Sequence, residues 1–125
     1  MIKTLIITTL LFLTCLTLVI AQDTPPPFDK IKSIALLQTP DADGNYIAKR
    51  TILASGVMYW ACYLPERKVV AIVRFNQSNT LAVEYWEAYK RFALYNDGDR
   101  VEISLEKAIE LVHQLLLEAN GMQSI

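Results

Sequence analysis

The sequence predicts a small α+β domain, an antiparallel four- to five-stranded meander with a C-terminal amphipathic helix packed on one face. Short apolar and β-branched runs alternate with turn sequences between residues 31 and 75, which is typical of consecutive hairpins. An aromatic-rich stretch at 80–95 has helical spacing and predicts an additional helix. Near the C-terminus, a wide apolar stripe follows a helix-capping serine.

The first 21 residues predict a secretory signal peptide. Lys3 precedes an uncharged apolar run that ends at Ala21, and Val19 and Ala21 fit the −3 and −1 positions of a cleavage site. Residues 5–21 also reach the lower length limit of a membrane-spanning helix, so an uncleaved N-terminal anchor is the alternative. In both cases the domain is expected outside the cytoplasm, periplasmic or secreted, with membrane contact only through residues 5–21 if they stay uncleaved.

Residues 22–29 are expected to form a linker, because three consecutive prolines, Pro25 to Pro27, favour an extended spacer. Residues 30–125 then form a single globular domain. A segment of that length, rich in aliphatic and aromatic residues, is enough for one hydrophobic core but not for two domains.

Four strands are expected in the first half of the domain, separated by turns of two to six residues that are rich in Pro, Gly and Asp. The third and fourth runs are apolar on both faces, which is typical of central strands covered on both sides. The expected strands are 31–39, 46–54, 57–64 and 69–75.

Residues 80–95 fit two structures. Ala82, Tyr85, Trp86, Tyr89, Phe92 and Ala93 would share one face of a helix. Glu87 and Arg91 would form a favourable i,i+4 pair, and this pattern favours a helix. The many aromatic residues also suit a strand.

The C-terminal part is clearer. Residues 96–99 predict a turn, and residues 100–103 a short strand. Ser104 is expected to cap a helix that begins at Leu105, and Asn120-Gly121 to end it.

Charge and motif content exclude several function classes. The 13 acidic and 12 basic residues nearly balance, and the basic residues are scattered, which argues against a nucleic-acid-binding surface. Asp41-Ala42-Asp43-Gly44-Asn45 starts like a calcium loop, but its sixth and twelfth positions lack the required Gly and Glu, so a polar turn is expected. His113 is the only histidine and is expected on a solvated helix face, while Cys62 is expected to be buried; we therefore expect no metal site and no cofactor.

We do not expect an enzyme, because the chain has no phosphate-binding loop and no activated nucleophile. The alternative is a small acid–base enzyme that uses Glu84 and Glu87, which would lie about one turn apart on a helix.

Two short aromatic segments suggest a binding surface, although core packing is a competing role for the same rings. In a strand, Tyr59 and Tyr63 would face one way and Trp60 the other. The expected function is an exported interaction module that binds a protein or envelope component through an aromatic surface. The alternative is a small-molecule carrier, in which the rings line a pocket. The candidate residues are Tyr59, Trp60, Tyr63, Tyr85, Trp86 and Tyr89.

Overall fold

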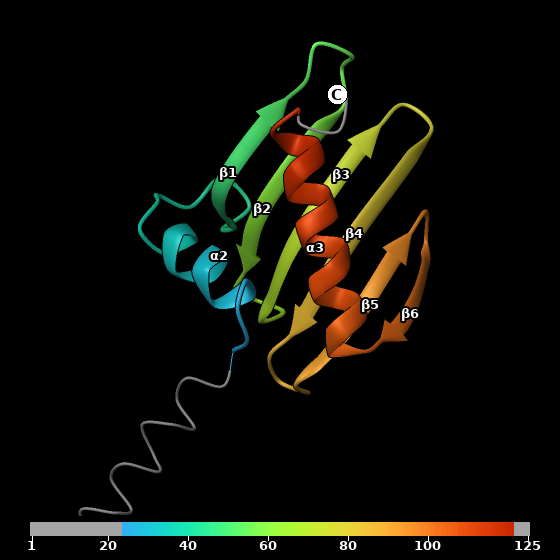
Figure 1. Ribbon diagram of the computed structural model, residues 1–125. Helices are drawn as coiled ribbons and strands as arrows, with labels where there is room; N and C mark the ends of the chain where they lie inside the picture. The colour runs from blue at the N-terminus through green and yellow to red at the C-terminus, as the bar shows by residue number, and fades with distance from the viewer. Residues whose placement is uncertain (1–23, 122–125) are drawn as a thin grey trace, which may run out of the picture.

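Six antiparallel strands form one sheet in which each strand pairs with its neighbour in the sequence (Figure 1). The computed structural model describes residues 24–121. The predicted α+β class and meander are confirmed, with six strands instead of four or five. The elements are α2 Phe28–Ala35, β1 Tyr46–Ile52, β2 Met58–Leu64, β3 Val69–Asn76, β4 Asn79–Trp86, β5 Arg91–Asn96, β6 Asp99–Ile103 and α3 Leu105–Ala119.

The helix expected at 80–95 is wrong, because this stretch is the β4–β5 hairpin. Tyr85 lies opposite Phe92, and the turn is closed by Lys90 in a left-handed conformation with φ of 54°. The apolar positions that fit one helical face are therefore divided between the two faces of the sheet and the turn. Pairing with β3 on one side satisfies the backbone of β4 without a helix.

The strand expected at 31–39 is also wrong, because α2 occupies Phe28–Ala35. Phe28, Ile31 and Ala35 are buried, and their spacing of three and four residues matches one face of a helix. The helix begins directly after its N-cap residue, Pro27, which makes no side-chain capping hydrogen bond. Its first two residues, Phe28 and Asp29, thus fall within residues 22–29, which were expected to be a linker.

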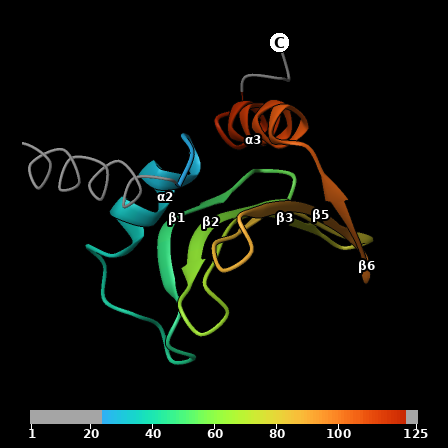
Figure 2. The same cartoon turned by 90° about the horizontal axis from the view of Figure 1, so that it is seen from below.

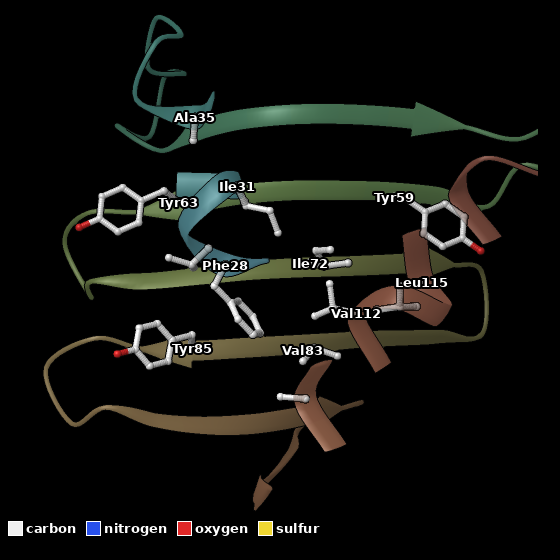
Figure 3. Packing of buried hydrophobic residues seen from close by; sticks show 12 residues of the cluster. Phe28, Ile31, Ala35, Tyr59, Tyr63, Ile72, Val83, Tyr85, Val112 and Leu115 are labelled. Carbon is white, nitrogen blue, oxygen red and sulfur yellow. The ribbon is translucent and has the colours of Figure 1, made fainter. Parts of the chain in front are cut away.

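Both helices pack on the same face of the sheet, as the view along the strands shows (Figure 2). In α3, Ser104 caps the helix by accepting a hydrogen bond from the backbone N–H of Lys107 at 3.1 Å, as predicted. Ala108, Val112 and Leu115 form the buried stripe, and His113 is exposed. The core lies between the helices and strands β2 to β5, where the ring of Phe28 contacts those of Tyr85 and Phe92 (Figure 3).

No described helix covers the second face of the sheet, so the expectation that β2 and β3 are covered on both sides is wrong. We call this second surface the bare face. Cys62 and Ala71 are nevertheless buried on it, because larger side chains pack around them, including those of Leu64, Val73 and Trp86. The prediction that Cys62 is a buried thiol is confirmed.

The predicted signal peptide or anchor at 1–21 lies outside the described residues. Within residues 24–121, neither helix has the length and hydropathy needed to cross a membrane.

Candidate functional site

The six candidate binding residues do not come together. Tyr59, Tyr63 and Tyr85 point into the core beneath the helices (Figure 3). Trp60 and Trp86 lie on the bare face, where Trp86 packs beside Cys62. Tyr89 lies in the β4–β5 turn and is 69% exposed. The alternation predicted for Tyr59, Trp60 and Tyr63 is therefore correct, and it divides the six residues between core, bare face and turn.

One end of the bare face carries a compact polar and aromatic group, which we call the Arg100 cluster: Glu84, Trp86, Tyr95 and Arg100. The Arg100 guanidinium donates to Glu84 through Nε at 2.8 Å and through a terminal nitrogen at 3.1 Å. It also lies over the rings of Trp86 and Tyr95, with its central carbon 5.4 and 4.9 Å from the ring centroids. The hydrogen bonds to Glu84 raise the pKa of Arg100, so the guanidinium stays charged.

Sequence reasoning missed Arg100 and Tyr95. Arg100 is on β6 and Glu84 on β4, and β5 lies between them in the sheet. No local spacing relates residues on strands that are not neighbours, so the sequence contains no direct signal for this contact.

A second aromatic group lies toward the other edge of the bare face. The rings of Trp60 and Phe75 stack with centroids 6.3 Å apart at an angle of 22°. The Arg50 guanidinium lies 5.5 Å from the Trp60 ring, close enough for a cation–π contact. Phe75 is exposed, and the Trp60 Nε1 is buried without a hydrogen-bond partner among the described residues. Both ends of the bare face therefore pair an arginine with aromatic rings.

Cys62, near the middle of the bare face, is a buried thiol. Burial raises its thiol pKa to about 11, and the nearby charges of Asp41 and Glu84 act in the same direction. The thiol therefore stays protonated at neutral pH. Asp41 accepts hydrogen bonds at 2.9 Å from the backbone N–H groups of Asp43 and Asn45, which makes its segment the polar turn that was predicted.

The two carboxylates of the acid–base alternative do not face one site. Glu84 is on the bare face with Arg100, whereas Glu87 accepts hydrogen bonds from Tyr63 Oη at 3.0 Å and from Lys32 on α2. Each carboxylate is held by its own ion pair. Burial and the bond to Glu87 raise the pKa of Tyr63 to about 12.

A cavity of about 720 Å³ opens on the other face, between the β1–β2 turn and the end of α3. At its wall, Glu118 accepts hydrogen bonds from Tyr59 Oη and Arg74, both at 2.9 Å. Burial and this bond raise the pKa of Tyr59 to about 12. Burial alone would raise the pKa of Glu118, but hydrogen bonds from Arg74 and Tyr59 outweigh it and lower the pKa. The Nε of Arg74 is buried and has no partner in the described part of the chain.

Of the six candidate residues, only Tyr59 lines this cavity. Within residues 24–121, no group of three or more His, Cys, Asp or Glu side chains is placed to hold a metal ion. Comparisons with protein-family models, curated proteins and solved structures found no match to this chain.

Proposed function

We propose that this chain is a small exported interaction module that binds a protein partner or an envelope component through its bare face. One observation supports this most directly. Both described helices pack on one face of the sheet, while the opposite face presents Trp60, Phe75 and Trp86 without a covering element. The apolar run at residues 4–21 supports export.

The chemistry of the bare face suits protein recognition. Trp and Arg are the residue types most enriched among those that dominate binding energy, and here they occur in contact with each other. Arg100 is already held by Glu84, Trp86 and Tyr95 before any partner arrives. Less side-chain entropy is therefore lost on binding than for a free arginine.

The charges of the bare face indicate the partner's character. Register places Arg50, Arg91 and Arg100 on this face, whereas Glu84 and Glu102 supply two carboxylates that are already paired. Asp41 adds a third carboxylate, near Cys62. Arg50 has no ion-pair partner in the described part of the chain, and it contacts the Trp60 ring on which the exposed Phe75 ring stacks. We therefore expect a surface that combines apolar side chains with carboxylates.

Site-specific photo-crosslinking tests this proposal. A photoreactive residue placed at Phe75 or Arg91 reports the bare face, and one placed at Leu117 reports the exposed side of α3. We expect crosslinks to the same partner from both bare-face positions and none from Leu117, which is equally accessible to solvent. Crosslinking mainly from Leu117 would contradict the proposal.

Once a partner is captured, two substitutions measure the role of the aromatic rings. Trp86→Ala should weaken binding at least about tenfold, because truncation of a buried Trp anchor costs about 1.4 kcal/mol or more. As a control, Leu117→Ala removes an exposed apolar side chain on α3, away from the bare face, and should leave the affinity unchanged. Circular dichroism verifies that both variants remain folded.

A small-molecule carrier is the second candidate function, and the cavity at the end of α3 supports it. Its wall combines apolar residues such as Leu53 and Val57 with the unpartnered Nε of Arg74. These features suit an apolar ligand that carries an anionic or carbonyl acceptor. Binding of anilinonaphthalene sulfonate that is lost in Arg74→Met and kept in Arg50→Met would support this site. Equal binding by both variants would argue against it.

A further inference from the structure

Strand β6 leaves one side of its backbone unpaired. It pairs only with β5, and all of Asp99 to Glu102 are exposed. Figure 1 places β6 at the margin of the sheet with no described element beyond it. Such an edge presents a row of N–H and C=O groups that can pair with another strand.

The other edge of the sheet is protected. In β1 the register shifts between Ile47 and Lys49, which indicates a bulge, and α2 packs against this strand. Bulges and covering helices are devices that prevent edge pairing. Of the protective devices, β6 has only its short length and its charged side chains, and its register with β5 is regular throughout.

The order of side chains in β6 is self-complementary. If two copies of Asp99–Ile103 pair antiparallel about Val101, Arg100 lies opposite Glu102 of the second copy, and Glu102 lies opposite Arg100 of the second copy. Opposite charges at such directly facing positions are stabilising. Both residues point to the bare face, so the pairs form on the same side of the sheet.

Other registers are unfavourable. Pairing about Arg100 or Glu102 places two like charges directly opposite each other. A register centred between two neighbouring residues would place a side chain of the bare face opposite a side chain of the helix side. This mismatch arises because successive residues of a strand point to opposite faces. The sequence of β6 thus favours the register that is centred on Val101.

The existing contacts of the charged residues are compatible with this pairing. Arg100 has five N–H donors and uses two of them on Glu84. Glu102 accepts from Arg91 at 3.0 Å through one oxygen, and its other oxygen has no protein partner in the described part of the chain. Across the junction, the charges would alternate from Glu84 through Arg100 to Glu102 of the second copy and on to Arg91 of the second copy.

The helix side of β6 adds apolar contact. Val101 is 55% exposed, and Leu105, at the start of α3, is 40% exposed. Pairing about Val101 would bring the two Val101 side chains together at the centre of the junction and cover this surface.

We propose that β6 pairs antiparallel with β6 of a second copy of this chain, centred on Val101. The two sheets then form one continuous sheet with all helices on the same side and both bare faces on the other. This pairing does not depend on the function proposed for the bare face. A five-residue junction is smaller than a standard interface, so the dimer is weak and its population depends on concentration.

Disulfide trapping tests the register. In a Cys15→Ser, Cys62→Ala background of the full chain, Val101→Cys should give a linked dimer on mild oxidation. The two Cα atoms would lie about 4.5–5.5 Å apart, which is within the range that a disulfide spans. Glu102→Cys should link poorly, since its two copies lie on a diagonal about 7–8 Å apart. Failure of Val101→Cys to link, or equal linking by Glu102→Cys, would overturn the proposal.

Sedimentation equilibrium tests the dimer without a crosslink. The unmodified chain should show a monomer–dimer equilibrium in the micromolar to millimolar range. Val101→Lys, which places two like charges together, should stay monomeric. Ile52→Lys makes the same change at an exposed position on the β1 edge and should dimerise like the parent. A parent that is monomeric at its highest soluble concentration, or a Val101→Lys variant that still dimerises, would show that β6 does not self-pair.

Discussion

Trp86 donates a 2.9 Å hydrogen bond from its indole Nε1 to Glu84, two residues earlier on the same strand. Residues i and i+2 of a strand face the same side, so this bond runs along β4 on the bare face. It fixes the orientation of the indole ring. It also gives a partner to the indole N–H, which is part of a partly buried side chain. The same carboxylate also binds Arg100, which makes Glu84 the centre of the cluster.

Arg100→Met should lower the free energy of unfolding by about 1–3 kcal/mol, because Glu84 stays buried with only Trp86 as donor. We place the loss below that of a fully buried pair because the Arg100 side chain is 40% exposed. Arg91→Met breaks an ion pair that is exposed on both sides and should cost less than about 0.5 kcal/mol. Denaturant unfolding measures both, and equal losses would contradict a structural role for Glu84.

Leu115→Ala should destabilise the domain by about 2–5 kcal/mol, because the side chain is buried between α3 and the sheet. Leu117→Ala, the same change two residues along on the exposed side of the helix, should have little effect. Thermal melting of the two variants gives the comparison. Similar melting temperatures would mean that α3 does not dock through this stripe.

Stability should fall at high pH. The pKa values of Tyr59 and Tyr63 are raised from 10 to about 12 in the folded chain, so the unfolded chain loses these protons first. Between these values the folded state binds more protons, and stability therefore decreases as pH rises from 10 to 12. Below pH 10 the contribution is complete.

Denaturant midpoints at a series of pH values measure this effect. Replacing both tyrosines by Phe should flatten the decline above pH 10, since the titrating hydroxyls are gone. An unchanged decline in the double variant would assign the effect to other groups.

Lys68→Gly should stabilise the domain by up to about 1 kcal/mol. Lys68 has φ of 57° in the β2–β3 turn, a region that costs a side-chain-bearing residue energy and costs glycine almost none. Lys68→Ala keeps the strain and should not show this gain. A thermal shift assay distinguishes them, and stabilisation by Ala equal to that by Gly would exclude relief of backbone strain.

The parts of the fold that the sequence predicted correctly carry local signals. Strands β1 to β3 are bounded by turn residues such as Gly56 and Pro65, and α3 begins at the capping Ser104. The β4–β5 turn lacks such a signal, because Lys90 occupies a left-handed position where Gly or Asn is usual. Because the sequence has no turn signal at this point, the aromatic residues of the two strands have a spacing that also fits one face of a helix.

The site was less predictable than the fold. Strand alternation separated Trp60 from Tyr59 and Tyr63 correctly, since that pattern is local. Whether a face is covered depends on where distant helices pack, so the sequence did not distinguish core rings from bare-face rings. To predict the Arg100 cluster, one must know that β4, β5 and β6 lie side by side in this order, and the spacing of residues in the sequence does not give that order.

The position of Phe28 has a consequence for the order of folding. Every strand pairs with its chain neighbour, so the hairpins can close one after another as the chain is made. Phe28, at the start of α2, packs against Tyr85 and Phe92, which are synthesised much later. Its ring therefore lacks these two partners until β5 has been synthesised. The packing of α2 is completed late, although α2 is the first described element to leave the ribosome and also contacts the earlier strands β1 and β2.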